Sequence, residues 1–293
     1  MITNKASTLK SLMQEDTVIM PGVFNPLTAK LAEKIGFRAL YVSGAALHQS
    51  WGLPDTGGLY SSKKNEKYVF SPSKYLEMAI DITQATGLPT IVDIDTGFGS
   101  ARNLQNAVKR LEKAGAAGIQ IEDQVFPKRC GHLNEKEIIS IKEMRLRIKT
   151  AVKARENSDF LIVARTDARC NFPVNLIVDR AMLYKEAGAD IIFPEALKTK
   201  EEFRYFYELV KPYWTKPLLI ANMTEFGKTP YITAQEFKEM DYSAVIFPVS
   251  AMRVAMKAME DFFKCLKETG TQKNFIDKMQ TRQELYDLIR YKL

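Results

Sequence analysis

The stretch Lys185-Glu-Ala-Gly-Ala-Asp-Ile-Ile-Phe193 is the clearest indication of the fold of this 293-residue chain. Charged, helix-favouring residues run into Gly188, and a short apolar run follows almost at once. A glycine in this place supplies the left-handed residue that ends a helix, so the stretch predicts a helix that passes directly into a strand. The same order occurs twice more, around Gly36 in residues 33–42 and around Gly115 in residues 112–121. A recurring helix-to-strand unit predicts an α/β protein.

Eight short segments are apolar and rich in β-branched residues, as are strands buried on both faces of a parallel sheet. They are residues 17–20, 39–42, 90–94, 118–121, 160–164, 191–193, 217–221 and 244–247. Helical patterns lie between them, for example at 103–114 and 176–187. Eight such units predict a (β/α)8 barrel of the TIM type, which typically needs about 250 residues. An open doubly wound sheet is the alternative, but the first strand is not followed by the Gly-x-Gly-x-x-Gly of a dinucleotide-binding version.

The chain continues beyond the eighth predicted strand. Residues 250–268 form a long helical pattern, and residues 274–291 form a second, amphipathic one. No linker or low-complexity segment divides the chain, so we expect one barrel domain over residues 1–293, with residues 269–293 as a helical extension. Because the repeat offers no place for this extension, we expect it to pack on a partner subunit.

The composition is that of a folded globular protein and excludes several classes of function. Hydrophobic residues make up 46% of the chain and charged residues 26%, and no run of about 18 apolar residues predicts a membrane span. The net charge of +7 is spread along the chain without basic patches between aromatics, so we expect no nucleic-acid partner. Whether this charge steers an anionic substrate stays open. Three scattered cysteines without an export signal predict reduced thiols and a cytoplasmic location.

Polar residues gather where the predicted strands end. They are Ser43 and Gly44, Asp93 and Asp95, Glu122 and Asp123, Arg165 and Asp167, Glu195, Asn222 and Thr224, and Ser250. In barrels of this type the chemistry takes place at the carboxyl ends of the strands. Stability does not explain why so many polar groups meet at one end, although Asp123 or Asp167 alone would fit an ordinary turn. The sequence therefore predicts an active site at this end.

Asp93 and Asp95 are two residues apart, so we expect their side chains on the same side of the third strand. Two carboxylates this close repel each other unless a positive charge lies between them. A divalent cation would supply that charge, and oxygen ligands without a His/Cys cluster favour Mg²⁺ or Mn²⁺ over Zn²⁺. A pair that shares one proton is the competing interpretation. Asp55, in a turn-rich loop after the second strand, would join the metal site or cap the turn.

The segment Lys128-Arg-Cys-Gly-His132 follows the fourth predicted strand. It contains one of the three cysteines and one of the two histidines in the chain. Cations beside a thiol tune its reactivity, so the segment favours a functional Cys130. A solvated charged loop with an idle cysteine is the alternative.

These segments together resemble the isocitrate lyase/phosphoenolpyruvate mutase superfamily and, within it, the 2-methylisocitrate lyases. The likeness covers nearly the whole chain and rests on Pro21-Gly22, Tyr41-Val-Ser-Gly, Gly52-Leu-Pro-Asp, Val92-Asp-Ile-Asp-Thr-Gly-Phe-Gly, Ile121-Glu-Asp-Gln, Lys128-Arg-Cys-Gly-His, Ala164-Arg-Thr-Asp-Ala, Phe193-Pro-Glu-Ala, Asn222-Met-Thr-Glu-Phe-Gly and residues 280–286. The resemblance implies a Mg²⁺-dependent lyase that cleaves a C–C bond of 2-methylisocitrate, a small anionic tricarboxylate, to give pyruvate and succinate. It also implies a homotetramer whose C-terminal helices are swapped between subunits.

The resemblance further implies roles for single residues. Metal contacts, direct or through water, would come from Asp55, Asp93, Asp95 and Glu122. Substrate contacts would come from Ser43, Gly44, Ala45, Gly131, His132, Arg165, Glu195, Asn222, Thr224 and Arg253. Cys130 would be the catalytic acid on a mobile loop, and Arg165 would hold a substrate carboxylate. Tyr41 is our candidate for the base.

Two positions depart from the family pattern. Ala45 stands where the family often has glycine, which leaves less space near the substrate, and Gln120 stands where many members have histidine, so we assign it no proton transfer. Isocitrate lyases share the cysteine loop but are usually much longer, whereas oxaloacetate decarboxylases of the superfamily usually lack this cysteine. Phe193-Pro194 and Phe247-Pro248 resemble the methylisocitrate lyases. A non-catalytic binding protein is the alternative from another class, and Cys130 with the metal carboxylates argues against it.

Overall fold

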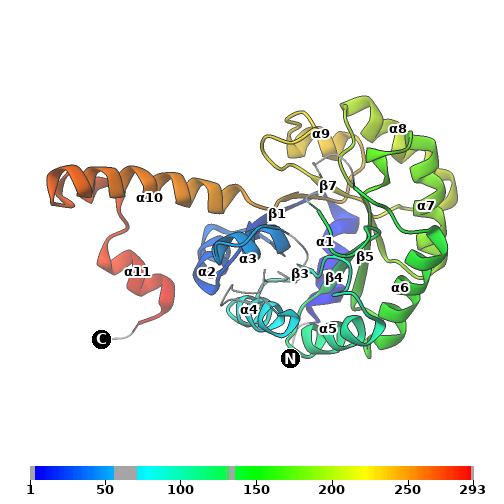
Figure 1. Cartoon of the computed structure of the whole chain (residues 1–293), viewed down its shortest axis with the longest axis horizontal. Coiled ribbons are helices and arrows are strands. Elements are labelled where there is room, and N and C mark those ends of the chain that lie inside the picture. Colours follow the sequence, from blue (N-terminus) through cyan, green and yellow to red (C-terminus); the bar gives the residue numbers. More distant parts are fainter. Residues whose placement is uncertain (1–3, 56–70, 130, 132–135, 292–293) are drawn as a thin grey trace, which may run out of the picture.

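Eight parallel strands form a barrel with helices around its outside (Figure 1). This computed structural model describes residues 4–55, 71–129, 131 and 136–291. The strand order is β6-β5-β4-β3-β2-β1-β8-β7, and an isolated parallel bridge between Ile192 and Leu219 joins its two ends. The (β/α)8 barrel predicted from the repeat is therefore confirmed, and an open doubly wound sheet is excluded.

Every predicted strand is present, with small shifts at its ends. The strands are β1 (Val18–Val23), β2 (Leu40–Val42), β3 (Thr90–Asp93), β4 (Gly118–Glu122), β5 (Leu161–Thr166), β6 (Ile191–Pro194), β7 (Ile220–Asn222) and β8 (Ala244–Phe247). β1 is longer than expected because its last residues, Gly22 and Val23, pair with β2 after the first four have paired with β8. β7 begins later than expected, at Ile220, and Leu219 before it forms the isolated bridge to Ile192.

Helices follow the strands, and most of them cover the outside of the barrel. They are α2 (Pro26–Ile35), α3 (Gly44–Ser50), α4 (Pro72–Gln84), α5 (Ala101–Lys113), α6 (Ile141–Ala154), α7 (Val174–Glu186), α8 (Lys200–Val210) and α9 (Ala234–Glu239), with 3-10 turns η1 (Ala168–Cys170) and η2 (Lys211–Tyr213). In α5 the Ser100 hydroxyl accepts a hydrogen bond from the N–H of Asn103 and starts the helix. The predicted helix-ending glycines have left-handed backbones, with φ of 100° at Gly36, 86° at Gly115 and 106° at Gly188.

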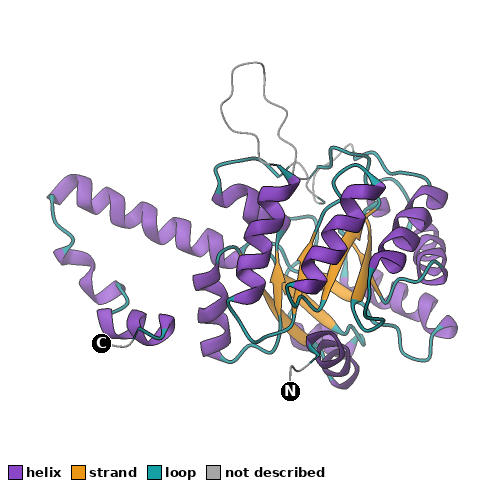
Figure 2. Cartoon of the chain, turned by 90° about the horizontal axis from the view of Figure 1, so that it is seen from below, coloured by secondary structure: helices purple, strands orange, loops and turns teal. Residues whose placement is uncertain are grey.

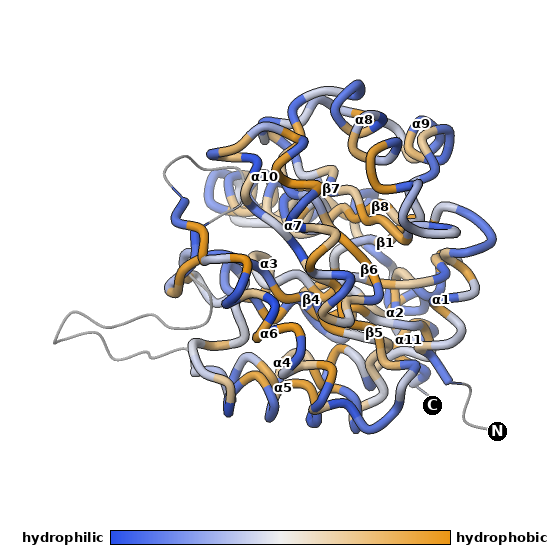
Figure 3. The backbone as a smooth tube through the Cα atoms, turned by 90° about the vertical axis from the view of Figure 1, so that its right-hand side faces the viewer, coloured by the Kyte–Doolittle hydropathy of each residue, from blue (hydrophilic) through white to orange (hydrophobic). Residues whose placement is uncertain are grey.

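The protein has two main layers of apolar packing. One lies between the strands and the outer helices, and the other fills the inside of the barrel. Leu9 and Met13 of α1 (Lys5–Glu15) belong to the inner layer, so this helix covers the amino end of the barrel. The strands are mostly hydrophobic in colour, whereas the outer helices also carry hydrophilic stretches (Figure 3). The opposite, carboxyl end of the barrel is left for polar residues.

The C-terminal part of the chain leaves the barrel. α10 (Ser250–Thr269) projects away from the strands, and η3 (Lys273–Lys278) and α11 (Arg282–Ile289) follow it (Figures 1 and 2). The expectation of one helix over residues 274–291 was wrong, because Thr281 and Glu284 form a capping box that starts α11 anew. Within the described ranges, no helix is both long and apolar enough to cross a bilayer.

Candidate active site

Five of the polar residues expected at the strand ends, Ser43, Asp93, Arg165, Asn222 and Thr224, line one cavity. Its lining residues are Tyr41, Ser43, Ala45, Gln49, Asp55, Asp93, Lys128, Gly131, Arg165, Asn222, Thr224, Ile246, Pro248, Val249 and Arg253. Two expected members of the site, Cys130 and His132, lie outside the described residues. The cavity is at the carboxyl end of the barrel, where this fold places its chemistry.

Three buried carboxylates meet beside this cavity. One oxygen from each of Asp93, Asp95 and Glu122 lies within 4.8 Å of the others. Asp93 ends β3 and Glu122 ends β4. Asp95 lies beyond its strand, with a left-handed φ of 51°, so the strand alternation that we expected does not place it. A turn does so instead, in which the Asp95 N–H donates to Oδ1 of Asp93 at 2.9 Å.

The chemistry of these carboxylates fits a divalent cation. Oδ2 of Asp95 and Oε2 of Glu122 are buried and have no hydrogen-bond partner among the described residues. Burial, and next the charge of Asp95, raises the pKa of Asp93 to about 7. Burial also raises the pKa of Glu122 well above its ordinary value. Arg165, whose Nε lies 3.5 Å from Oε2 of Glu122, compensates this charge only in part. Buried oxygen ligands of this kind suit a hard ion such as Mg²⁺.

Lys128 brings Asp55 to this cluster. Its ammonium group lies 2.5 Å from Oδ1 of Asp55 and 2.9 Å from Oδ1 of Asp95. Burial acts to lower the pKa of Lys128, but Asp55 and Asp95 outweigh it, so the pKa is raised well above its ordinary value. Lys128 therefore stays charged and partly neutralises the two carboxylates. The sequence indicates Lys128 only as a neighbour of Cys130 and does not reveal its contact with Asp55 and Asp95.

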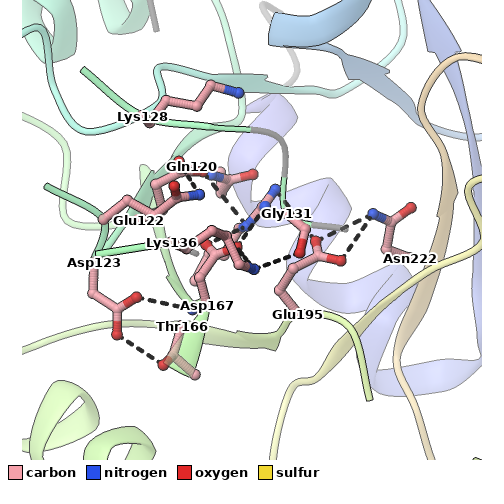
Figure 4. Close-up of polar contacts among 12 residues, drawn as sticks. Gln120, Glu122, Asp123, Lys128, Gly131, Lys136, Thr166, Asp167, Glu195 and Asn222 are labelled. Carbon is pink, nitrogen blue, oxygen red and sulfur yellow. Dashed lines mark hydrogen bonds and ion pairs between the residues drawn. The ribbon is translucent and has the colours of Figure 1, made fainter. Parts of the chain in front are cut away.

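Arg165 is the centre of a second charged group. Its Nε lies 2.9 Å from Oδ2 of Asp167, and its Nη2 donates to Oδ1 of the same carboxylate at 3.0 Å. Its Nη1 lies 3.3 Å from Oε2 of Glu195, to which the amide of Asn222 donates at 3.2 Å. The side chains of Glu195 and Asn222 point toward each other in Figure 4. The structure thus brings together three residues for which the resemblance implies substrate contacts.

Gly131 lies directly against this group. A Cβ at this position would collide with Nη2 of Arg165 and would lie 2.8 Å from Cγ of Glu195. Only glycine lets the backbone come this close. The peptide of Gly131 is therefore part of the cavity wall.

The remaining expected substrate residues lie at the cavity with different surroundings. Ser43 caps α3, since its hydroxyl accepts from the Ala46 N–H at 3.2 Å. Next to it, a Cβ on Gly44 would lie 3.1 Å from Oδ2 of Asp93. Arg253 is held by Glu225, whose Oε2 lies 2.7 Å from its Nη1. Ala45 and Thr224 line the cavity.

Tyr41 is buried inside the barrel and points its hydroxyl at Gln120. The hydroxyl donates to Oε1 of Gln120 at 2.5 Å. Burial, and next the charge of Asp93, raises the pKa of Tyr41 well above 10. The phenol therefore keeps its proton at neutral pH, and the role of Tyr41 as a base stays a prediction that its surroundings oppose.

Comparison with known proteins places this site in a family. The family model described as phosphoenolpyruvate phosphomutase matches residues 9–267. The chain belongs to the phosphoenolpyruvate mutase/isocitrate lyase superfamily. The resemblance seen in the motifs is thereby confirmed.

Relatives in this superfamily match the chain over nearly its full length. The 2-methylisocitrate lyase of Aeropyrum pernix is 51% identical, covering 97% of this chain and 86% of the relative. A crystal structure of 2,3-dimethylmalate lyase superposes with a TM-score of 0.86 at 32% identity, covering 99% of this chain and 92% of that one. The structure of phosphonopyruvate hydrolase with oxalate and Mg²⁺ superposes with a TM-score of 0.83 at 30% identity, covering 98% of this chain and 95% of that one.

Three buried residues of this superfamily member were not assigned roles from the sequence. They are Lys128, Lys136 and Gln124, all close to the segment 128–132. Lys136 contacts Asp167, which is 31 residues away in the chain. The sequence signal for such residues is weak, because a lysine or glutamine in a charged loop is normally solvated.

Proposed function

We propose that this protein is a 2-methylisocitrate lyase, which cleaves a C–C bond of 2-methylisocitrate to give pyruvate and succinate. The observation that carries the proposal is a cavity lined both by Asp93 of the three-carboxylate cluster and by Arg165. The first group suits a metal and the second suits a carboxylate. A relative with this activity in its name, 51% identical over 97% of the chain, supports the same substrate.

The metal would be held by Asp93, Asp95 and Glu122, with Asp55 as a further ligand. Mg²⁺ is our first choice and Mn²⁺ the second, because the donors are carboxylate oxygens alone. When bound, the ion would supply Lewis-acid stabilisation of the oxygen that becomes the ketone of pyruvate. The structural neighbour solved with Mg²⁺ supports this choice.

The substrate would be held through its carboxylates. The planar guanidinium of Arg165 suits a two-point contact with a carboxylate, and Asp167 fixes its orientation. Glu195, Asn222, Thr224 and Arg253 would bind the rest of the molecule, together with Ser43, Gly44 and Ala45. A small anionic tricarboxylate is the ligand class that fits these cations.

Proton transfer in the reaction is assigned by resemblance alone. Cys130 would protonate the carbanion of the succinate half, and His132 with the Gly131 N–H would stabilise it. The base stays open, with Tyr41 as a weakened candidate. A Cys130→Ser variant should still bind ligand but turn over poorly, and near-normal turnover would remove Cys130 from this role.

The assembly would be a homotetramer whose C-terminal helices are exchanged between subunits. α10 projects from the barrel (Figure 1), and Val254 and Phe263 on it are exposed in the single chain. Burying apolar side chains on a second copy would stabilise the pair. We propose one barrel domain with an extension from residue 269, acting in the cytoplasm.

A side-by-side assay tests the substrate. The enzyme with Mg²⁺ receives 2-methylisocitrate, isocitrate, 2,3-dimethylmalate or oxaloacetate, and pyruvate, succinate and glyoxylate are measured. We expect the highest kcat/KM for 2-methylisocitrate. Some isocitrate cleavage is compatible with this, because one methyl group is worth only about 1–3 kcal/mol of discrimination. A higher kcat/KM for any of the other three substrates would replace the proposal with that rival.

A further inference from the structure

Lys136 is a buried lysine for which the proposed reaction has no use. It is 3% exposed, and its Nζ donates to Oδ1 of Asp167 at 2.8 Å and to the carbonyl oxygen of Gly131. Burying an ammonium group is costly unless its donors are satisfied. Gly131 lines the cavity, and Asp167 holds Arg165, which lines it too. Lys136, Asp167 and Gly131 lie together in Figure 4. The contacts suggest that Lys136 serves the site and not the barrel core.

Gln124 makes a matching set of contacts nearby. It is 1% exposed. Its Nε2 donates to the carbonyl oxygen of Arg129 at 2.9 Å and to Oε1 of Glu122 at 3.1 Å. Its Oε1 accepts from the N–H of Arg129 at 3.0 Å. One side chain therefore holds both backbone polar groups of Arg129 and ties them to a metal carboxylate.

A short antiparallel ribbon, made of residues 123–125 and 137–139, contains Gln124 and is directly preceded by Lys136. Gln124 and Ile138 form its bridge. The Val125 N–H donates to the Glu137 carbonyl at 2.8 Å, and the Ile139 N–H donates to the Asp123 carbonyl at 2.9 Å. The ribbon fixes the place from which Gln124 and Lys136 reach the segment between them.

Asp167 couples this segment to the substrate site. The same carboxylate accepts from Lys136 and from Arg165. Gly131, which Lys136 holds, lies against Arg165 and Glu195. A movement of the Lys136 ammonium would therefore shift both the Gly131 peptide and the guanidinium that is expected to bind a carboxylate.

We propose that Gln124 and Lys136 are positioning residues of the lyase, which fix the backbone at Arg129 and Gly131 against the Arg165 group. This inference rests on the proposed function. The two positions that they hold are the chain neighbours of Cys130, which lies outside the described residues. Neither Gln124 nor Lys136 touches the reacting atoms in this account.

The first test is kinetic. Lys136→Met keeps a long, unbranched side chain and removes its charge. We expect kcat for 2-methylisocitrate to fall about 10–100-fold while KM changes less than about 3-fold. The reason is that misplacing a group of the site by ~1 Å can lower the rate by that much. Gln124→Met should give the same pattern, and Lys136→Arg should recover part of the loss. The double variant should lose less than the product of the two single losses, because both act on one segment.

Arg155→Met is the matched control. Arg155 also pairs with an aspartate and a carbonyl, at 2.6 Å from Oδ2 of the half-buried Asp190 and 2.5 Å from the Phe160 oxygen, but it is remote from the cavity. We expect Lys136→Met and Arg155→Met to lower Tm alike, and only the former to lower kcat. Equal kcat losses in the two variants, or wild-type kcat in both Lys136→Met and Gln124→Met, would overturn the inference.

A readout that needs no turnover separates this inference from the proposed function. Hydrogen exchange of the peptide that spans residues 125–136 should rise in Lys136→Met and in Gln124→Met but not in Arg155→Met. Unchanged exchange in both variants contradicts the positioning role even if the wild type is active. If the wild type is inactive but exchange still rises in the variants, the lyase assignment is contradicted. The positioning of the Arg129 and Gly131 backbone by Gln124 and Lys136 is then still supported.

Discussion

The ammonium group of Lys128 lies 2.9 Å from a carboxylate oxygen of Asp95, and both side chains are buried. Asp95 is also one of the three carboxylates that would hold the metal. The lysine and a divalent cation therefore share one carboxylate, so their charges repel each other when both are present.

The first prediction concerns this repulsion. Lys128→Met removes a positive charge beside the metal site and frees Asp55. We expect this variant to bind Mn²⁺ at least about tenfold more tightly than the wild type, because two charges ~4 Å apart near a protein surface interact by several kcal/mol. Isothermal titration measures the affinity, with Lys257→Met on the exposed face of α10 as the control. Unchanged or weaker binding in Lys128→Met would show that the lysine does not act against the cation.

The second prediction concerns Asp93 without metal. Burial, and next Asp95, raises its pKa to about 7, whereas the unfolded chain releases this proton near pH ~4. The folded state therefore holds the Asp93 proton more tightly than the unfolded chain does. The resulting stabilisation of the fold is complete below about pH 4 and is lost as the pH rises toward 7. In a chelating buffer we expect the Tm of the wild type to fall as the pH rises from about 4 to 7. The Tm of Asp93→Asn should fall less steeply over the same pH range.

Added Mg²⁺ provides the control for that prediction. The ion replaces the proton as the partner of the carboxylates, so it should raise the Tm of the wild type near pH 8 more than that of Asp93→Asn. Equal slopes for the two proteins in chelator, together with equal shifts by Mg²⁺, would contradict a metal site at Asp93.

The third prediction concerns Asp167. Burial acts to raise its pKa, but Arg165 and Lys136 outweigh it and hold the pKa below its ordinary value. Asp167 therefore stabilises the fold above about pH 4, and this stabilisation is lost as the pH falls further. Asp167→Asn leaves two buried cations without their shared partner and should cost about 3–5 kcal/mol of unfolding free energy at pH 7. Urea unfolding should show that the difference in unfolding free energy between wild type and Asp167→Asn becomes smaller below about pH 4. A difference that does not change with pH would count against this charge pairing.

The fourth prediction concerns the close approach of Gly131. Gly131→Ala places a methyl group against Arg165 and Glu195, so we expect kcat/KM to fall about 100-fold or more, as displacements near reacting groups do. Gly36→Ala is the control, since its Cβ would meet open space and its cost is about 1 kcal/mol of stability from the left-handed backbone. Similar activity in the two variants would remove Gly131 from the site.

The barrel could be predicted from the sequence because its signal is local and repeated. Three units repeat a helix-ending glycine, at Gly36, Gly115 and Gly188, and every unit has its own buried strand, so an error in one unit does not change the fold. The C-terminal extension has no such repeat. Its break between η3 and α11 depends on the single capping box at Thr281, which an amphipathic pattern over residues 274–291 does not reveal.

The candidate site could be predicted where residues follow strands in order. Asp93, Glu122, Arg165, Glu195 and Asn222 lie at the carboxyl ends of strands or directly after them, and the barrel brings those ends together. Lys128 and Lys136 could not be found this way, because their partners are distant in the chain and a loop lysine is normally exposed. The backbone turn at Asp95 was missed for a related reason, since alternation along a strand stops where the strand ends.

The most direct test of the account is the fate of 2-methylisocitrate in the presence of the purified protein. Carbon NMR follows the substrate with Mg²⁺, with excess chelator, and with Mg²⁺ added back. We expect equal amounts of pyruvate and succinate with Mg²⁺. Their formation should stop in chelator and return with added Mg²⁺, and Arg165→Met should form neither product. An intact substrate in the presence of Mg²⁺, or cleavage that is indifferent to the chelator, would contradict the account.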